Sequence, residues 1–418
     1  MAVTPPSPSD YSRWSPLGDG ESYAGPELRE WQTRALEAWE ASDHRGVVEA
    51  VTGTGKSLVG VAAIHEVLSL GGVALVMVPT LALVEQWVAN LRAQLPEARI
   101  GALSGLEKTD FRNSNVIVAT VQTLSRRALP GTSLTLIVAD EVHRYGSERF
   151  GNALSEQYQW RLGLTGTYER SGDDGKQQVL DPYFGGTILD YSYGEALADG
   201  VVAPFDLAFI GVHFEPTEQA EYSVADENVK DATYKLKKFY GYPDPWPDFF
   251  ASVTRNLATD HYDDELKLCR QYMSGFSDRK KILAAAQGKL AVVEKIGPFL
   301  EQRSGTLLFA EGKDAARRHA FVLSKSTTAF PLDGESKQLE RSSKLRDFEA
   351  GRLKVIATPK IFDEGMDVHG AEVAIVVAAS QSRRQMIQRM GRVIRLKDDG
   401  SHARMVMLYV VGTPEDPN

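Results

Sequence analysis

Short apolar runs alternate with helical patterns along the first half of the chain. The runs are rich in valine, isoleucine and leucine, which is typical of strands that are covered on both faces of a sheet. They lie at residues 47–51, 73–78, 116–119, 135–139 and 162–164. Helices are predicted at residues 28–36, 57–64 and 81–95. This alternation predicts an α/β fold whose parallel sheet has helices on both faces.

The second half of the chain has further strand signals, separated by a long helical segment. Strands are predicted at residues 207–212 and 307–310, and the residues between them are largely helical in pattern, for example at 282–296. A chain of 418 residues exceeds one ordinary core, so two domains of about 150 to 200 residues and an insertion are expected. The predicted organisation is a flexible tail at 1–26, a first domain at 27–203, and a second domain at 204–414 with the insertion at about 216–300.

A glycine-rich segment, Ala-Val-Thr-Gly-Thr-Gly-Lys-Ser at residues 50–57, joins a predicted strand to a predicted helix. This is the context of a phosphate-binding loop, in which Gly53 and Gly55 allow backbone amides to turn toward a phosphate. Lys56 then reaches the β and γ phosphates of a nucleoside triphosphate, and the hydroxyl of Ser57 ligates Mg²⁺. The alternative is a glycine-rich turn without a ligand.

Two adjacent acids, Asp140 and Glu141, follow the apolar run at residues 135–139. They are therefore expected at the carboxyl end of a buried strand, where ligands bind in open α/β sheets. We assign Asp140 to Mg²⁺, through a water molecule, and Glu141 to orienting and deprotonating the attacking water. The alternative is an ordinary helix-capping pair.

Other polar residues near the predicted strand ends are candidates for contacts with a nucleotide or a nucleic acid. Gln32 can make the paired amide hydrogen bonds that an adenine edge accepts. Thr80 and Thr120 end two predicted strands and offer hydroxyl groups to phosphate oxygens of a polynucleotide, although threonines at strand ends are also common for structural reasons. The expected nucleotide-binding residues of the first domain are Arg29, Gln32, Thr52, Gly53, Thr54, Gly55, Lys56, Ser57 and Asp140, with Ser57 and Asp140 as the metal ligands.

Composition limits the class of protein. Cys269 is the only cysteine, which excludes an internal disulfide framework and a cysteine cluster for zinc, and fits a reducing cytoplasm. No apolar run approaches the roughly 20 residues of a transmembrane helix, so no membrane partner is expected. The net charge of −9 argues against a general nucleic-acid coat protein but leaves a local positive lining open.

The order of these motifs resembles a superfamily 2 helicase. The first half of such a helicase is matched by Gln32, the glycine-rich loop, the strand ends, Asp-Glu-Val-His at 140–143 and Leu-Thr-Gly-Thr at 164–167. In the second half, residues 307–310 resemble motif IV, residues 356–358 with 363–367 resemble motif V, and residues 388–395 resemble motif VI. The resemblance implies two RecA-like parallel-sheet domains in tandem, with ATP and Mg²⁺ as ligands.

Within that superfamily, residues 161–170 and 362–368 resemble the xeroderma pigmentosum group B branch, including its smaller archaeal, bacterial and phage relatives. That branch often has Arg-Glu-Asp after the third motif, whereas this chain has Glu-Arg-Ser-Gly-Asp-Asp at 169–174. The N-terminal region is also too short for the damage-recognition domain of larger relatives, so lesion recognition is not expected.

The same resemblance assigns roles in the second domain. Arg392 and Arg395 are the expected arginine fingers, which stabilise charge on the transferred phosphoryl group and increase rates by about 10³ to 10⁵ elsewhere. Gln388 is expected at the γ-phosphate, so the expected catalytic residues are Lys56, Glu141, Gln388, Arg392 and Arg395. Gly365 and Asp367 are expected near the ribose, and Thr358 at the nucleic acid. The alternative for the arginines is a solvated basic helix face.

Basic and aromatic residues interleave inside the predicted insertion, at residues 235–246. The resemblance suggests a thumb-like helical insertion here, and Lys237, Lys238 and Tyr240 are candidates for holding phosphates and stacking on bases. The alternative is a plain helical hairpin whose aromatic residues form a local core.

The function expected from these features is that of an ATP-dependent DNA helicase or double-strand DNA translocase in repair, recombination or defence. The partners expected are duplex, forked or branched DNA rather than RNA, and a separate nuclease or repair protein, with the protein in the cytoplasm at the nucleoid. Two alternatives are the motor subunit of a restriction or phage-defence complex with a separate nuclease, and an ATP-switched DNA-binding clamp that does not travel.

Overall fold

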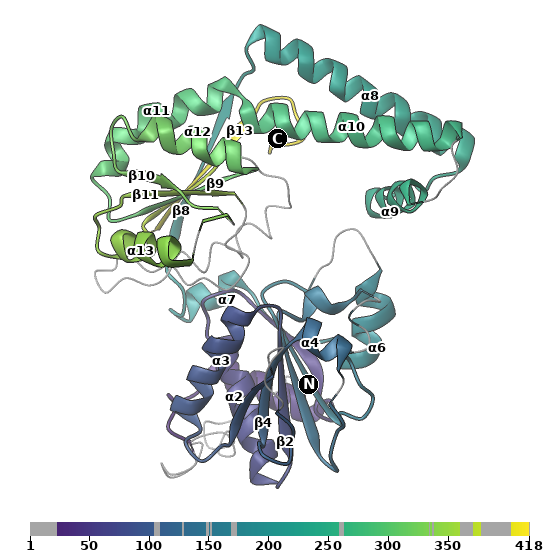
Figure 1. The fold of residues 1–418 in the computed structure, drawn as a ribbon, viewed down its shortest axis with the longest axis vertical. Coiled ribbons are helices and arrows are strands. Elements are labelled where there is room, and N and C mark those ends of the chain that lie inside the picture. The colour runs from purple at the N-terminus through teal and green to yellow at the C-terminus, as the bar shows by residue number, and fades with distance from the viewer. Residues whose placement is uncertain are drawn as a thin grey trace, which may run out of the picture. The chain divides into compact units, whose positions relative to one another are not determined.

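The computed structural model describes most of the chain, which forms two compact units that divide between Val201 and Val202. Each unit is built around its own parallel sheet (Figure 1). The described residues are 23–103, 109–127, 129–147, 150, 153–168, 174–258, 263–333, 335–336, 338–359, 371–377 and 403–417.

The first unit contains a parallel sheet of seven described strands in the order β3-β4-β2-β5-β6-β1-β7. Its strands are β1 (Arg45–Ala50), β2 (Val73–Val78), β3 (Ile100–Leu103), β4 (Val116–Thr120), β5 (Thr135–Asp140), β6 (Trp160–Thr165) and β7 (Thr187–Tyr191). Its helical elements are α1 (Glu30–Ala41), α2 (Lys56–Ser69), α3 (Leu81–Gln94), α4 (Val121–Arg126), η2 (Val142–Tyr145), η3 (Lys176–Leu180), α6 (Asp181–Phe184) and α7 (Tyr193–Ala198). The five strands predicted from apolar runs are confirmed.

The edge strands β3 and β7 were not predicted. Both are short and only partly buried, so they lack the continuous apolar run of the central strands. The order of strands has a functional consequence, because parallel strands bring their carboxyl ends to one edge of the sheet. The 51–55 loop after β1, the end of β5 and the turn after β6 therefore lie at the same edge, on neighbouring strands.

The second unit contains a parallel sheet in the order β10-β11-β9-β12-β13-β8. Its strands are β8 (Phe205–Val212), β9 (Thr306–Ala310), β10 (Ala329–Pro331), β11 (Val355–Pro359), β12 (Val373–Val376) and β13 (Ala403–Val410). Its helices are α8 (Pro216–Tyr240), α9 (Trp246–Leu257), α10 (Asp264–Ala285), α11 (Gln287–Glu301), α12 (Lys313–Leu323) and α13 (Gln338–Glu349).

Both faces of this second sheet are covered. Leu307 and Ile356 pack with Phe348 of α13 in one apolar cluster. The neighbouring residue Leu308 packs in another cluster, with Val293 of α11. Successive strand residues point to opposite faces, so helices on both sides account for the uninterrupted apolar runs. The predicted α/β class, with two RecA-like sheets, is confirmed.

A helical arm, α8 to α10, leaves the second sheet after β8. Helices α8 and α10 run side by side (Figure 1). Gly275 of α10 allows this approach, because a Cβ atom there would lie 2.9 Å from the carbonyl oxygen of Ala225 on α8. The predicted helical character of residues 216–300 is thus observed.

The helical pattern predicted at residues 282–296 is observed, but it is divided between two helices. Helix α10 ends at Ala285 and α11 begins at Gln287, because Ala286 between them has an extended backbone with ψ 122°. Gly288 then packs against the end of β8, where a Cβ atom would lie 2.9 Å from the carbonyl oxygen of His213. A one-residue break leaves the apolar periodicity almost unchanged, so the sequence pattern does not show it.

Candidate active site

The 51–55 loop has the backbone that its glycines predict. Gly53 and Gly55 have φ values of 88° and 90°, a region that other residues adopt only with strain. Between them, the buried hydroxyl of Thr54 donates to the carbonyl oxygen of Val51 at 2.8 Å. Helix α2 begins immediately afterwards at Lys56, so its amino end, with its unpaired amides and positive dipole, adjoins the loop.

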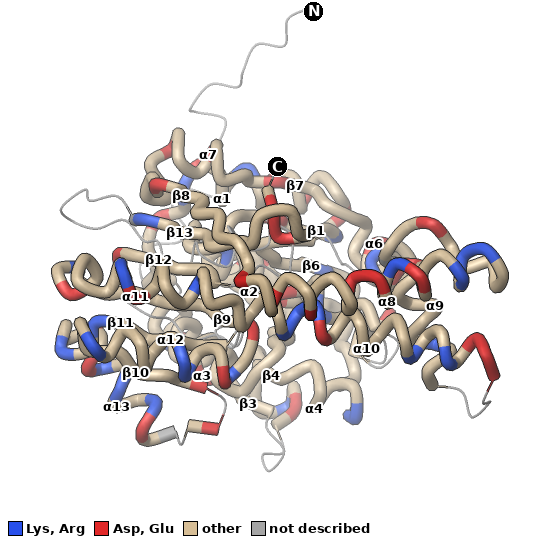
Figure 2. The backbone as a smooth tube through the Cα atoms, turned by 90° about the horizontal axis from the view of Figure 1, so that it is seen from above, with Lys and Arg blue, Asp and Glu red and all other residues tan. Residues whose placement is uncertain are grey.

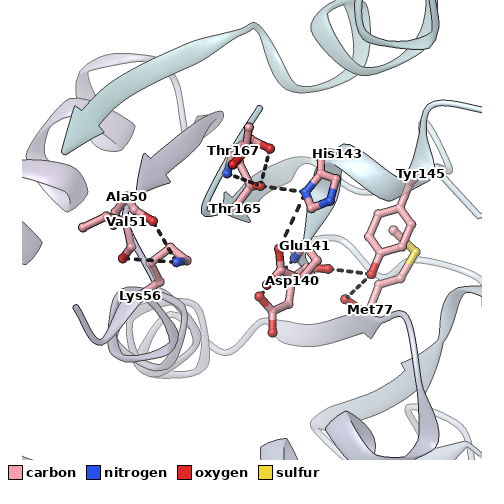
Figure 3. Close-up of polar contacts among 10 residues, drawn as sticks. All are labelled: Ala50, Val51, Lys56, Met77, Asp140, Glu141, His143, Tyr145, Thr165 and Thr167. Carbon is pink, nitrogen blue, oxygen red and sulfur yellow. Dashed lines mark hydrogen bonds and ion pairs between the residues drawn. The ribbon is translucent and has the colours of Figure 1, made fainter. Parts of the chain in front are cut away.

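Lys56 closes the loop onto the strand that precedes it. Its Nζ donates to the carbonyl oxygens of Ala50 at 2.7 Å and Val51 at 3.4 Å (Figure 3). The ammonium group is therefore held at the carboxyl end of β1. From there it can exchange these carbonyl oxygens for a phosphate oxygen as its hydrogen-bond acceptor, with little movement of the helix.

Helix α1 is tied to the same loop. The Oε1 of Gln32 accepts from the backbone N–H of Arg29 at 2.8 Å, and its Nε2 donates to the carbonyl oxygen of Gly55 at 3.0 Å. The guanidinium of Arg29 donates to the carbonyl oxygen of Thr54 at 3.4 Å. The Gln32 side chain is 2% exposed, so it supports the loop here, and its predicted contact with adenine stays a prediction.

Asp140 is the last residue of β5, and three groups fix it. Its Oδ2 accepts from the indole Nε1 of Trp87 at 2.9 Å, and its Oδ1 accepts from the backbone N–H of Glu141 at 3.0 Å. The hydroxyl of Tyr145, which is fully buried, donates to the carbonyl oxygen of Asp140 at 2.5 Å (Figure 3). Burial, with the two acids nearby, raises the pKa of Tyr145 well above its ordinary value, so the phenol stays protonated and remains a donor.

Glu141 has a left-handed backbone, with φ 53° and ψ 46°. This conformation costs a non-glycine residue about 1 to 2 kcal/mol, and such strain is concentrated at functional sites. Its side chain is 12% exposed, and one carboxylate oxygen lies 3.6 Å from the Nδ1 of His143. The turn therefore directs the carboxylate toward the end of the neighbouring strand β6.

His143 connects the ends of β5 and β6. Its Nδ1 lies 2.8 Å from the Oγ1 of Thr165 (Figure 3). The Thr165 hydroxyl donates its single hydrogen to the carbonyl oxygen of Thr167 at 2.8 Å, and it accepts from the N–H of Thr167 at 3.0 Å. Nδ1 must therefore carry the hydrogen of the bond to Thr165. Both segments are expected at strand ends from their sequences, but this bond between them was not predicted.

The three threonines predicted at a nucleic acid all have local hydrogen-bonding roles. The Oγ1 atoms of Thr80 and Thr120 accept from backbone N–H groups at the starts of α3 and α4, at 3.4 Å and 3.3 Å. Thr358 is 1% exposed, and its hydroxyl donates to the carbonyl oxygen of Pro359 at 3.0 Å. Contacts of these threonines with DNA stay predictions, and the burial of Thr358 does not favour one.

Thr52 lies in the 51–55 loop, and Ser57 lies in the first turn of α2. The other predicted site residues lie on the arm or outside the described residues. Lys237, Lys238 and Tyr240 lie at the end of α8. The residues outside the described ranges are Gly365, Asp367, Gln388, Arg392 and Arg395. Among the described residues, no cluster of three or more His, Cys, Asp or Glu side chains could hold a metal ion. No helix in the same part of the chain is long and apolar enough to cross a membrane.

Two protein families match the chain. Residues 25–170 match the family described as "Type III restriction enzyme, res subunit". Residues 288–397 match the family described as "Helicase conserved C-terminal domain". The first match spans the phosphate-loop candidate and the β5–β6 strand ends, and the second spans β9, β11 and β12.

Curated relatives match along nearly the whole chain. It is 28% identical to "DNA 3'-5' translocase XPB2" of Sulfurisphaera tokodaii, over 93% of this chain and 83% of that protein. It is 27% identical to "DNA 3'-5' helicase XPB" of Kineococcus radiotolerans and 25% identical to the protein of the same name in Mycobacterium tuberculosis, over 92% of this chain. It spans 61% and 62% of the length of those two proteins.

A solved structure has the same fold. The helicase domain of Hef from Pyrococcus furiosus superposes with a TM-score of 0.58 at 19% identity, over 91% of this chain and 96% of that one. Two parallel sheets, with a glycine-rich loop and paired acids at one edge of the first sheet, are the features of RecA-like ATPases. These family matches and the relatives named XPB support a superfamily 2 helicase of the XPB branch, as the motifs predicted.

Proposed function

We propose that this chain is an ATP-driven motor that acts on DNA, either separating strands or moving along the duplex. The helicase families and the named relatives support an ATP-hydrolysing DNA helicase or translocase. The observation that carries the proposal is the shared sheet edge, where the 51–55 loop, the Asp140 carboxylate and the His143–Thr165 pair follow three neighbouring strands.

The residues at this edge suit a magnesium nucleotide. The amides of the 51–55 loop and the amino end of α2 suit the phosphates, and Lys56 supplies a positive charge beside them. The hydroxyl of Ser57 and the carboxylate of Asp140 are hard oxygen donors of the kind that Mg²⁺ prefers. Bound Mg²⁺ would neutralise charge on the β and γ phosphate oxygens.

Within this site we assign Glu141 to the attacking water. Its carboxylate is mostly buried at the strand end, and the strained backbone and His143 restrict its direction. A fixed carboxylate can orient a water molecule and accept its proton. The bond from His143 to Thr165 then links the position of this carboxylate to the turn after β6. Arg392 and Arg395 of motif VI, which lie outside the described residues, are proposed to stabilise charge on the transferred phosphoryl group.

A triplex-displacement experiment tests motor activity and separates it from a stationary ATP-switched clamp. The wild-type protein with ATP should strip a third strand from duplex DNA, because movement along the duplex removes obstacles. The variant Glu141→Gln should bind ATP but leave the third strand in place. If the wild-type protein hydrolyses ATP but displaces the third strand no faster with ATP than without it, movement along the duplex is overturned and the clamp is favoured.

We further propose that the tip of the arm contacts DNA. The aromatic residues of the predicted segment divide between a core and the surface: Tyr242 packs against the apolar core of the arm, whereas Phe239 is 65% exposed and Tyr240 is 40% exposed. Lys238 lies over the rings of Tyr234 and Phe239, at 5.0 Å and 5.5 Å. Exposed rings beside lysines suit a nucleic-acid backbone and its bases.

The arm carries basic and acidic residues side by side and not one continuous basic surface. Figure 2 shows basic and acidic residues interspersed along α8 and α10, and Lys237 pairs with Asp244 at 2.9 Å. We therefore expect a few contacts at the tip rather than a continuous basic track. Replacing Lys237, Lys238 and Tyr240 together with alanine should weaken binding to a labelled duplex and reduce its salt dependence. Lys230→Ala, on the same helix, is the matched control, and equal binding by both variants would refute the contact.

The match to the restriction-subunit family favours a second candidate, the motor of a complex whose cutting is done by a separate nuclease. In that case the purified chain should hydrolyse ATP on DNA without cutting it, and cutting should appear when its native partner is added. A chain that needs no partner for its cellular task would instead act alone in repair or recombination. In either role we expect the protein to act at the nucleoid.

A further inference from the structure

Trp87 of α3 makes a buried contact with the paired-acid motif. Its side chain is 2% exposed, and its indole Nε1 donates to the Oδ2 of Asp140 at 2.9 Å, across 53 positions of sequence. An indole has one N–H and no acceptor, and an ionised carboxylate only accepts, so the direction of this bond is fixed. Away from water, a hydrogen bond to a charged group is stronger than one at the surface.

The ring of Trp87 also sets how close α2 comes to the sheet. A Cβ atom on Gly60 of α2 would lie 2.9 Å from the Cη2 of Trp87, and 3.1 Å and 3.2 Å from the side chains of Val138 and Leu164. The absence of a side chain at Gly60 thus allows the helix to rest against the indole and the strands β5 and β6. Ser57 lies three residues before Gly60, on the same face of α2.

One side chain therefore contacts both structural elements that carry the predicted metal ligands. Its N–H holds one oxygen of Asp140, while the N–H of Glu141 holds the other, so the plane of the carboxylate is fixed. Its ring also packs at Gly60 of α2, the helix that begins with Lys56 and Ser57.

We propose that Trp87 is a positioning residue for the metal site: it orients the Asp140 carboxylate and fixes the spacing of α2 from β5. This inference rests on the proposed ATPase function. Partners that orient a metal ligand are commonly worth about 10- to 100-fold in metal affinity or activity when removed. A core tryptophan with a satisfied N–H would stabilise the fold without affecting metal binding.

Trp39 supplies the matched control. It is fully buried in the same unit, and its indole N–H donates to the carbonyl oxygen of Arg161 at 3.0 Å. Arg161 lies at the amino end of β6, the opposite edge of the sheet from Asp140. Trp39→Phe and Trp87→Phe therefore each remove one buried indole hydrogen bond, but only the second removes it from the proposed metal site.

The test measures the affinity of Mn²⁺ for the ADP-loaded protein by electron paramagnetic resonance, beside ADP affinity in EDTA. Trp87→Phe should weaken Mn²⁺ binding about tenfold, with ADP affinity in EDTA unchanged. Trp39→Phe should match the wild type in both. Equal Mn²⁺ affinities for Trp87→Phe and the wild type would overturn the role of Trp87 while leaving the proposed function intact. No Mn²⁺ binding by wild-type protein with ADP, together with no ATP hydrolysis, would overturn both.

A second variant keeps the test decisive if Trp87→Phe does not fold. Benzothienylalanine at position 87 keeps the shape of the indole and replaces its N–H with sulfur, so it removes the donor alone. Weaker Mn²⁺ binding in this variant supports the orientation of Asp140 by the N–H. Wild-type binding in this variant would show that the N–H does not position the metal ligand.

Discussion

His319 should make the stability of the second unit depend on pH. It lies on α12, is 3% exposed, and its Nδ1 has no hydrogen-bond partner among the described residues. Burial lowers the pKa of His319 from 6.5 to about 4, and the positive charges of Arg318 and Lys289 contribute to the shift. The folded protein therefore keeps this imidazole neutral at pH values where the unfolded chain has protonated it.

The size of the effect follows from the two pKa values. Above about pH 6.5 the histidine is neutral in both states and the stabilisation is fully present. As the pH falls from 6.5 to 4, only the unfolded state binds the proton. A shift of about 2.5 units at 1.36 kcal/mol per unit then lowers the free energy of unfolding by about 3 kcal/mol at pH 4.

Urea unfolding of the wild type and His319→Gln at pH 7, 5.5 and 4 measures this difference. Hydrogen–deuterium exchange in peptides from β9 and β11, which pack near α12, reports on the second unit alone. Glutamine does not titrate in this range, so the variant should lose about 3 kcal/mol less stability than the wild type between pH 7 and pH 4. Parallel curves for the two proteins would show that His319 is not held neutral by its surroundings.

Three further substitutions test other contacts. Lys289→Met removes the ammonium group that lies 2.5 Å from the buried carboxylate of Glu415, so the free energy of unfolding in urea should fall by about 3 to 5 kcal/mol. The double variant with Glu415→Leu should recover most of this loss. A double variant that is no more stable than the single one would contradict the pairing. Gly275→Ala brings a methyl group against the α8 backbone and should cost about 1 to 3 kcal/mol, seen as faster hydrogen exchange in α8; unchanged exchange would refute the close packing. Tyr145→Phe removes the hydroxyl below the paired acids, so stability should fall by about 1 to 3 kcal/mol and the maximal ATPase rate should drop, while wild-type stability would argue against this hydrogen bond.

The central strands could be predicted because burial on both faces leaves a continuous apolar run in the sequence. Edge strands carry no such run: Thr187–Tyr191 is mostly exposed or half-buried, and it was missed for that reason. The break at Ala286 was also missed, because a single extended residue between two helices barely changes the apolar periodicity.

The residues of the candidate site also fall into two groups, those that the sequence predicts and those that it does not. The glycine-rich loop and the adjacent acids are local patterns, so the sequence alone places them at the ends of two strands. The contacts from Trp87 to Asp140 and from His143 to Thr165 join distant segments, and they depend on the order of strands in the sheet. No spacing in the sequence encodes that order, so these supporting residues emerge only from the structure.

The most direct test of the central claim is the steady-state rate of ATP hydrolysis measured without nucleic acid and with single-stranded DNA, duplex DNA, a forked duplex or RNA. Lys56→Ala, which removes the cation expected at the phosphates, provides the blank. A DNA-dependent motor predicts strong stimulation by at least one form of DNA, weaker stimulation by RNA, and no hydrolysis by the variant. Hydrolysis that is indifferent to every nucleic acid, or that persists in Lys56→Ala, would contradict the account.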